Sequence, residues 1–178
     1  MHELKIQVIA VVGSKKSGKT TTTEKMIREL TKRGYKVAAI KHVSEPNFTI
    51  DTARKDTWKF AQSGAKTTIS VAANEVATIE KVQLKSLSLE TLLKKCRGND
   101  VVFVEGLKKL VVTKKNVSKI VVVKSMKEAM HALESFKPIL AFSGPYSTEA
   151  LGFEIPYADA LKNPEKLADI IEDELLKK

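Results

Sequence analysis

One turn constrains the fold of this chain more than any other segment. Residues 13–20 read GSKKSGKT, which fits the pattern G-x-x-x-x-G-K-[S/T] in full. A β-branched apolar run at 4–12 precedes the turn, and apolar residues at helical spacing follow it from 19 to 33. A strand buried on both faces, a glycine-rich turn and a helix together predict the first part of a parallel α/β sheet.

The rest of the chain repeats this alternation of strands and helices. Apolar runs predict further strands at 36–41, 67–73, 76–82, 100–105, 119–123 and 138–142, and helical spacing predicts helices at 51–63, 87–95, 126–133 and from 163 to the end. We therefore expect an α/β fold of the phosphate-loop NTPase type, with three layers (α/β/α) and a mostly parallel sheet. With 178 residues and no repeat or linker, we expect one nucleotide-binding domain over 1–178.

The glycine-rich turn predicts a binding loop for nucleotide phosphates. Gly13 and Gly18 allow the backbone to curl, so that successive N–H groups point at phosphate oxygens. The positive end of the following helix faces the same oxygens. In this arrangement Lys19 contacts the β- and γ-phosphates, and the Thr20 hydroxyl binds Mg²⁺. The candidate nucleotide-binding residues are Gly13, Ser14, Lys15, Lys16, Ser17, Gly18, Lys19, Thr20 and Thr21.

A second candidate feature is an acid at the end of a neighbouring strand. Glu105 follows four apolar residues, and Gly106 then turns the chain away at the carboxyl end of the strand. Ligands of open α/β sheets bind at that edge. Asp100 begins the same strand at the opposite edge, so we favour Glu105, with Thr20, as the metal-side residue.

The charge of the chain indicates an anionic partner. Lys and Arg exceed Asp and Glu by 10, but 27 of the 31 basic residues are lysines and aromatic residues are only 6%. Base-reading contacts favour Arg and single-strand binding needs exposed aromatics, so nucleic acid is disfavoured. Residues 108–124 hold six lysines and no acid. They form either a docking surface for an anionic partner or a projecting hairpin kept soluble by its charge.

Cysteine content and hydropathy point to the cytoplasm. The single cysteine, Cys96, cannot form an internal disulfide, which favours a reducing compartment. The first residues do not have the layout of a signal peptide, and the longest apolar runs are far below the ~20 residues of a membrane span. We therefore expect a cytoplasmic protein without a membrane partner.

The sequence says least about recognition of the nucleotide base. Residues 113–116 (TKKN) are similar to the [N/T]-K-x-D guanine motif, but the acid is missing and the segment precedes a strand. An exposed lysine-rich loop or hairpin is the better interpretation. The turn at 143–145, which follows the last strand, is a more suitable place for a base contact on topology.

Four segments together carry a family resemblance. They are the 13–20 turn, AIKH at 39–42, DTARKDT at 51–57 with Gly-Ala at 64–65, and VEGLK at 104–108. In this order, over about residues 4–110, they resemble the MobB family of GTP-binding proteins in molybdopterin-guanine dinucleotide biosynthesis. The chain departs from the family pattern where Val43-Ser44 replace further histidines and where Arg54 replaces a usual glycine.

The resemblance implies binding of GTP and Mg²⁺, slow GTP hydrolysis at most, and a homodimer. It also implies partnership with MobA, the guanylyltransferase that joins GMP to molybdopterin. By the same resemblance Lys19 and Thr20 serve phosphate and metal, Glu105 serves the metal side, and Asp51 has a nearby acidic role. Lys41 and His42 are candidate contacts of the second loop, although His42 alone is equally well an ordinary loop histidine.

Two other nucleotide-dependent functions remain open. A small-molecule kinase would need fixed cations for the transferring phosphoryl group, and we expect only Arg54 and Arg97 near the nucleotide edge. A partitioning ATPase usually has a lysine second in the loop, where this chain has Ser14. Preference for GTP would favour the adapter interpretation, and preference for ATP either alternative.

Overall fold

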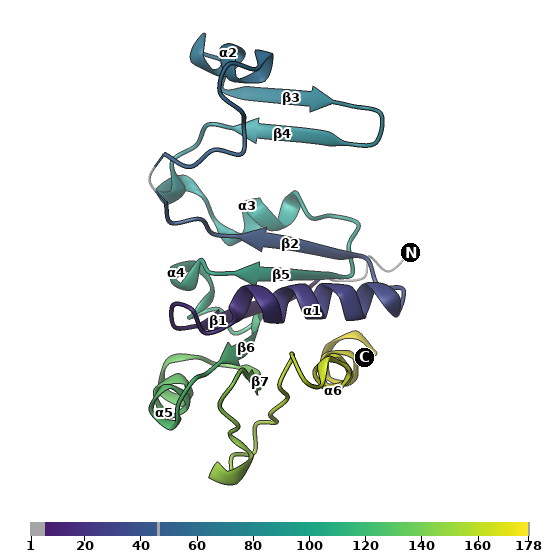
Figure 1. Ribbon diagram of the computed structural model, residues 1–178, viewed down its shortest axis with the longest axis vertical. Helices are drawn as coiled ribbons and strands as arrows, with labels where there is room; N and C mark the ends of the chain where they lie inside the picture. The colour runs from purple at the N-terminus through teal and green to yellow at the C-terminus, as the bar shows by residue number, and fades with distance from the viewer. Residues whose placement is uncertain (1–5, 46, 178) are drawn as a thin grey trace. The chain divides into compact units, whose positions relative to one another are not determined.

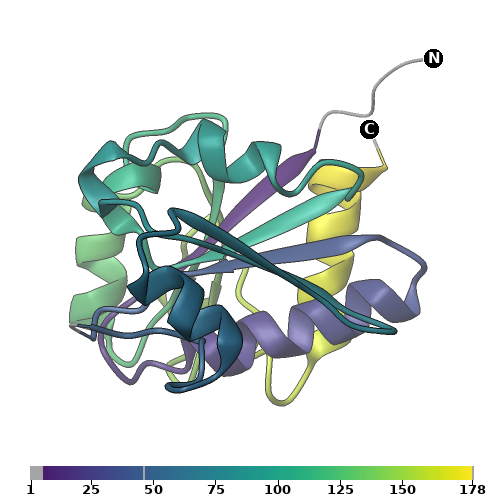
Figure 2. The ribbon, with the colours of Figure 1, turned by 90° about the horizontal axis from the view of Figure 1, so that it is seen from above.

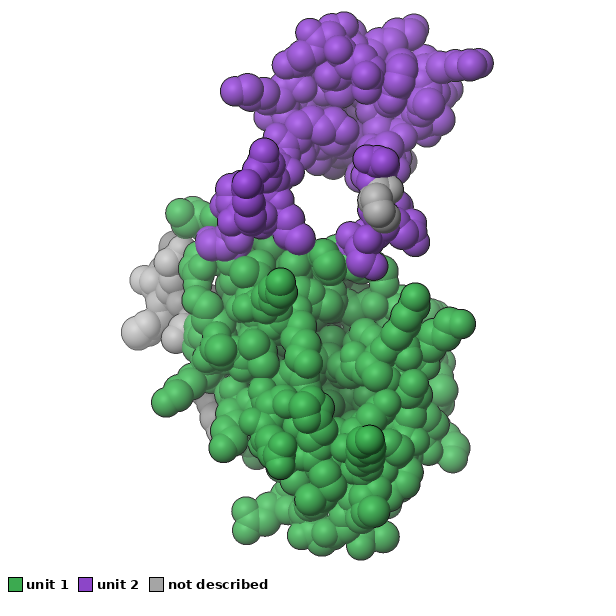
Figure 3. Space-filling model, turned by 90° about the vertical axis from the view of Figure 1, so that its left-hand side faces the viewer, with its two compact units in different colours: residues 1–42, 89–178 green, residues 43–88 purple. Residues whose placement is uncertain are grey.

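The computed structural model describes residues 6–45 and 47–177. The chain divides into two compact units, and Figure 3 shows them in different colours. Unit 1 is Met1–His42 with Leu89–Lys178, and unit 2 is Val43–Ser88. The expectation of one nucleotide-binding domain over 1–178 stays a prediction. In the described ranges, no helix combines the length and the apolarity needed to cross a bilayer.

Unit 1 contains a parallel sheet of five strands in the order β2-β5-β1-β6-β7 (Figure 1). All four neighbouring pairs run parallel, so their carboxyl ends meet at one edge. The strands are β1 (Gln7–Gly13), β2 (Val37–Lys41), β5 (Val101–Glu105), β6 (Ser118–Val122) and β7 (Ile139–Ser143). The predicted parallel α/β fold is confirmed. Residues 4 and 5 of the predicted first strand, and the start used in the signal-peptide argument, lie outside the described residues.

Side chains that alternate along the strands build a core on each face of this sheet. In β1, Val8, Ala10 and Val12 enter one core, while Ile9 and Val11 enter the other. The helices lie on both faces, as Figure 2 shows, which makes three layers. One face carries α1 (Lys19–Lys32) and α6 (Pro164–Ile171), and the other carries α3 (Leu89–Lys94), α4 (Lys108–Val111) and α5 (Met126–Ser135).

Unit 2 is a hairpin with one short helix. Strands β3 (Thr67–Val71) and β4 (Val76–Glu80) pair antiparallel, and α2 (Asp56–Gln62) packs against β3. Thr68 is buried on the covered face, whereas Ile69 on the opposite face is 60% exposed. This unit therefore has a small core, and an isolated two-stranded hairpin is only marginally stable in water.

Several helix boundaries differ from the prediction. Helix α2 begins at Asp56 and not at 51, because Lys55 is extended and Arg54 has a φ of 72°. No α2 side chain is buried, and Phe60 is 57% exposed. Helix α6 ends at Ile171 and continues as a π-helical turn. The 3₁₀ turns are η1 (Leu84–Ser86) and η2 (Glu149–Leu151), and the π turn is η3 (Glu172–Leu176).

The lysine-rich stretch 108–124 is not a projecting hairpin, which corrects that alternative. It begins with α4 and ends just after β6, an interior strand of the sheet. Lys119 is fully buried, and its ammonium donates hydrogen bonds to the carbonyl oxygens of Lys114 (2.6 Å) and Lys137 (2.7 Å). Burial lowers the pKa of Lys119. The ammonium of Lys114 lies 2.8 Å from a carboxylate oxygen of Glu90. The six lysines therefore do not form one exposed surface.

Candidate functional site

The 13–20 loop leaves β1 at the carboxyl edge of the sheet and opens α1. Gly13 has a φ of 152° and Gly18, the N-cap of α1, a φ of 100°, both on the side of the Ramachandran map that favours glycine. A Cβ atom at Gly13 would overlap the carbonyl oxygen of Val122 in β6 and lie 2.8 Å from Ser17 Oγ. The backbone curl and the close approach to β6 explain why glycine is needed at 13.

The interior of the loop holds one cation and two unpaired hydroxyls. The Lys19 ammonium donates a hydrogen bond across the loop to the Ser14 carbonyl oxygen at 2.6 Å. Burial, together with the positive charges of Lys41 and Lys124, lowers the pKa of Lys19, although Glu105 opposes this shift. Ser14 Oγ and Ser17 Oγ are buried and have no hydrogen-bond partner. Such atoms cost roughly 1–3 kcal/mol each, and phosphate oxygens would accept from both hydroxyls.

A cluster of oxygen and nitrogen atoms lies beside the loop at the end of β5. In the register of the sheet, Glu105 pairs with Val11 on one side and with Lys41 on the other. The Thr20 hydroxyl and the Lys41 ammonium each donate to Glu105 Oε1 at 2.8 Å. Lys41 Nζ also lies 3.1 Å from Thr20 Oγ1. The cluster joins the start of α1 to the ends of β2 and β5.

The donor atoms of this cluster fit magnesium. Mg²⁺ prefers hard oxygen ligands and usually takes only one or two carboxylates, completing its shell with phosphate and water. Thr20 and Glu105 offer one hydroxyl and one carboxylate. Among the described residues no group of three or more His, Cys, Asp and Glu side chains could hold a metal by itself. An ion held here would therefore depend on oxygens of a bound phosphate.

A hollow of about 390 Å³ opens next to Glu105, between α1 and the outer strand β2. Thr20, Lys41 and Glu105 of the cluster line it, together with apolar side chains such as Ile27 and Ile40. This space gives a ligand access to the Thr20–Glu105 pair.

The second-loop candidates fall in different units. His42 donates its backbone N–H to the Glu105 carbonyl oxygen at 2.9 Å, and a Cβ at Gly106 would lie 2.9 Å from that of His42. Lys41 and His42 are thus brought to the end of β5. Asp51 belongs to unit 2, where its Oδ1 accepts from the Thr57 hydroxyl at 2.8 Å and its Oδ2 is buried without a partner.

Two other charged residues lie at the amino edge of the sheet. Asp100 Oδ2 accepts from the backbone N–H of Lys36 at 2.7 Å, just before β5 begins. Arg97 lies in the turn that leads from α3 into β5. The expectation that Arg97 lies near the nucleotide edge is wrong, because the 13–20 loop lies at the other end of the strands.

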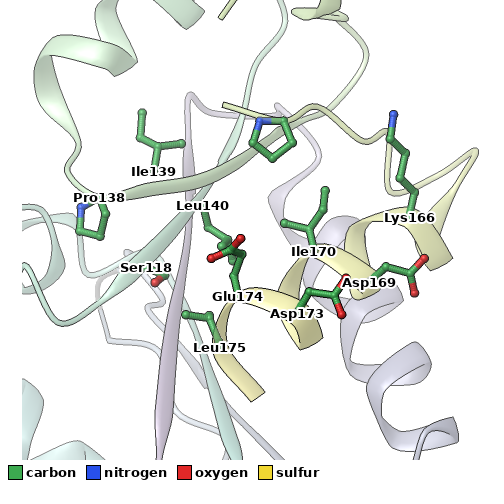
Figure 4. Close-up of a pocket in the computed structure, with 11 residues that line it drawn as sticks. Ser118, Pro138, Ile139, Leu140, Lys166, Asp169, Ile170, Asp173, Glu174 and Leu175 are labelled. Carbon is green, nitrogen blue, oxygen red and sulfur yellow. The ribbon is translucent and has the colours of Figure 1, made fainter. Parts of the chain in front are cut away.

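A larger hollow, of about 500 Å³, lies at this amino edge (Figure 4). The first residues of β6 and β7 line it together with acids from α6 and η3. Two of these acids are committed to ion pairs, Asp169 with Arg33 and Asp173 with Lys177. Its lining Lys166 pairs with Glu149. Nothing in it resembles a phosphate or metal site.

One residue near the loop was missed in the sequence. The Lys124 ammonium, just beyond β6, donates to the carbonyl oxygen of Lys15 at 3.2 Å. Its position directly after a strand predicted to be buried was the available signal, but the lysine was counted only as part of the 108–124 charge.

Unit 1 is thus a parallel α/β unit in which a glycine-rich loop opens the first helix at the carboxyl edge of the sheet, beside an acid and a lysine. The model of the family MobB, "Molybdopterin guanine dinucleotide synthesis protein B", matches residues 8–143. The chain belongs to the MobB family, as its four segments had indicated.

Curated relatives agree with this assignment. The chain is 36% identical over 105 residues to the molybdopterin-guanine dinucleotide biosynthesis adapter protein of Haemophilus influenzae. The aligned region covers 58% of each chain. It is 34% identical over 121 residues to a putative adapter protein of the same name from Methanocaldococcus jannaschii, covering 67% of this chain and 48% of that one. The matched region therefore spans about half the length of these relatives.

Solved structures share the fold over nearly the whole length. A crystal structure of molybdopterin-guanine biosynthesis protein B matches with a TM-score of 0.72 and 27% identity, covering 96% of this chain and 99% of that one. Bacillus subtilis MobB matches with a TM-score of 0.73 at 20% identity, covering 97% and 100%. At 20% identity, the match to Bacillus subtilis MobB shows a shared fold alone.

Proposed function

We propose that this chain binds GTP with Mg²⁺ in the 13–20 loop and acts as an adapter in molybdopterin-guanine dinucleotide biosynthesis. The observation that carries the proposal is the loop interior, where Ser14 Oγ and Ser17 Oγ are buried without partners beside the Lys19 ammonium. Oxygens of a phosphate chain supply the acceptors and the negative charge that this interior lacks. The biosynthetic role is supported by membership of the family and by the names of the curated relatives.

The proposed partner is a MobA-like guanylyltransferase, which joins GMP to molybdopterin. An adapter that holds GTP near such an enzyme would serve the reaction without carrying it out. We propose that the chain works in the cytoplasm, consistent with its single, unpaired Cys96.

Hydrolysis of GTP by this site is proposed to be slow at most. Fast phosphoryl transfer needs fixed cations, often an arginine, around the transferring group. Arg28 lines the hollow beside Thr20, but it is ion-paired with Glu24 at 3.1 Å. Among the described residues the cations in the loop and in contact with it are lysines: Lys15, Lys16, Lys19, Lys41 and Lys124. This arrangement favours binding over rapid turnover and argues against the kinase alternative.

The metal-side role of Glu105 can be tested by the variant Glu105→Gln. We expect it to lose most of the Mg²⁺-dependent gain in GTP affinity, about tenfold or more, because an amide oxygen is a much weaker Mg²⁺ ligand than a carboxylate. GTP binding in the presence of EDTA should survive. Calorimetric titrations of GTP with and without Mg²⁺ measure both quantities.

Asp100→Asn is the matched control, since it removes an acid from the other end of the same strand. It should leave the Mg²⁺-dependent gain unchanged. An equal fall in affinity with and without Mg²⁺ for Glu105→Gln would show that Glu105 is structural. Tighter binding of ATP than of GTP by the wild-type chain would contradict the adapter proposal.

We also propose that the chain forms a homodimer through unit 2. Most of the large apolar side chains that are exposed in the described residues lie in this unit, although it is only about a quarter of the chain. They are Phe48, Ile50, Phe60, Ile69, Val71, Val76, Val82 and Leu84. In the hairpin, Val71 and Val76 face each other on the uncovered side, next to Ile69. Exposed apolar faces of this kind mark interaction surfaces.

The charge and the edges of unit 2 suit a second copy. Residues 43–88 hold six Lys or Arg and five Asp or Glu, so two copies meet without net repulsion, unlike two copies of the strongly basic unit 1. Both β3 and β4 are edge strands of a two-stranded sheet, with unused backbone donors and acceptors. Pairing with a second copy would satisfy these groups and cover the apolar face.

Sedimentation velocity over a range of concentrations tests the dimer. We expect the wild-type chain to sediment at twice its 19.7 kDa and the double variant Ile69→Lys, Val76→Lys to sediment as a monomer. Each charge replaces a side chain at least 60% exposed. The control is Met126→Lys, Met130→Lys on α5, which changes two half-exposed apolar side chains of unit 1 and should stay dimeric. A monomeric wild-type chain would refute the proposal.

A further inference from the structure

A lysine approaches the 13–20 loop from the side opposite to Glu105. Strand β1 lies between β5 and β6, and Gly13 pairs with Val122 at the end of β6. Lys124 follows this strand end, and its ammonium donates to the Lys15 carbonyl oxygen at 3.2 Å. The loop is therefore flanked by the Glu105 carboxylate on the β5 side and by Lys124 on the β6 side.

Both ends of the Lys124 side chain are held in place. Its backbone N–H donates to Glu128 Oε2 at 2.9 Å, and the Glu128 N–H donates to Oγ of Ser125, the N-cap of α5, at 3.3 Å. The ammonium contacts the loop and lies 3.9 Å from Glu128 Oε1. The methylene stem lies between these two held ends, and the side chain is 40% exposed. It offers an apolar surface beside the loop.

The 143–145 turn, at the end of β7, packs against the end of β6. A Cβ at Gly144 would lie 2.7 Å from the Val123 carbonyl oxygen, and the Tyr146 N–H donates to that oxygen at 3.4 Å. The Tyr157 hydroxyl donates to the Gly144 carbonyl oxygen at 2.6 Å and fixes the turn. The 143–145 turn, which topology favoured for a base contact, thus lies next to the segment that carries Lys124.

The direction of a bound nucleotide follows from the metal-side residues. A Mg²⁺ ion held by Thr20 and Glu105 would draw the β- and γ-phosphate end of a nucleoside triphosphate toward these two residues. The α-phosphate and the nucleoside then extend away from β5, toward β6. The Lys124 stem and the 143–145 turn are the surfaces found there.

We infer that the methylene stem of Lys124 binds the face of the nucleotide's purine base, while its ammonium, tied to the Lys15 carbonyl oxygen, keeps the stem in position. This inference rests on the proposed nucleotide function and adds the surface on the base side. An aliphatic stem that covers a base buries about two methylene groups, which corresponds to roughly a tenfold gain in affinity.

Two variants with the same charge separate the stem from the ammonium. Lys124→Ala removes both, whereas Lys124→Met removes the charge and keeps an unbranched apolar side chain. We expect Lys124→Ala to bind Mg²⁺–GTP about tenfold more weakly than Lys124→Met does. Inorganic tripolyphosphate, which has no base, should bind equally to the two variants. Lys127→Ala, which changes an exposed lysine in the first turn of α5, is the control and should bind both ligands as the wild type does.

Calorimetry supplies the affinities, and thermal unfolding checks that both variants are folded. Equal GTP affinities for the Ala and Met variants would overturn the inference, since the stem would then contact no base. So would a tenfold difference that appears with tripolyphosphate as well, because the stem would then act on the loop itself. If the wild type binds neither ligand, the proposed function fails and the base contact fails with it.

Discussion

Replacing Lys19 with Ala is expected to weaken GTP binding about 10- to 100-fold while the fold stays intact. The ammonium of Lys19 is the cation inside the 13–20 loop, where it now donates to the Ser14 carbonyl oxygen. Charge-assisted hydrogen bonds contribute roughly 1.5–3 kcal/mol, and each 1.4 kcal/mol is a factor of ten in affinity. Calorimetric titration with Mg²⁺–GTP measures the loss.

The pH dependence gives a second readout for Lys19. Burial lowers its pKa, and phosphate binds the protonated amine, so GTP affinity should fall as pH rises through that lowered pKa. The Lys19→Ala variant should lack this fall. Lys127→Ala, an exposed lysine outside the loop, is the control for charge alone and should change affinity only slightly. Unchanged affinity of Lys19→Ala would remove the phosphate-loop assignment.

Replacing Gly13 with Ala is expected to lower the free energy of unfolding by about 3 kcal/mol or more. The new Cβ would overlap the Val122 carbonyl oxygen, which belongs to the backbone of a buried strand and cannot rotate away. The φ of 152° adds strain for any residue with a side chain. Urea unfolding followed by circular dichroism measures the change.

Gly34→Ala is the control that separates backbone strain from the contact with the Val122 carbonyl oxygen. Gly34 also has a positive φ, of 90°, but a Cβ there would meet no atom within 4 Å. It should therefore cost only the strain, about 1 kcal/mol. If both variants lose the same free energy of unfolding, the loop can move away from β6 at no cost. The close approach of Gly13 to Val122 would then not contribute to the effect of the substitution.

The sheet and the loop could be predicted because their sequence signals are local. A strand buried on both faces must be apolar throughout, and a strand followed by a glycine-rich turn and a helix has few other folds available. The same reasoning placed Glu105 at a strand end, and the structure has it at the end of β5, 2.8 Å from the Thr20 hydroxyl. The metal role of these residues stays a prediction.

The features that the sequence did not reveal depend on contacts between distant segments. Nothing local distinguishes Lys119, buried against two carbonyl oxygens, from the exposed lysines around it. Strands β3 and β4 have the composition of sheet strands, but composition does not say that they pair only with each other. Lys124 was overlooked for the same reason, since its partner Lys15 is far away in the sequence.

The order β2-β5-β1 interleaves the two stretches of chain that make up unit 1. Strand β5 comes from the stretch after unit 2 and is inserted between two strands of the stretch before it. Because β5 is hydrogen-bonded to β1 on one side and to β2 on the other, we expect that a chain cut within 43–88 leaves two fragments that stay paired through the sheet. The 13–20 loop and Lys41 come from one fragment, while Glu105 comes from the other. Backbone pairing, and not the covalent link, keeps the halves of the candidate site aligned.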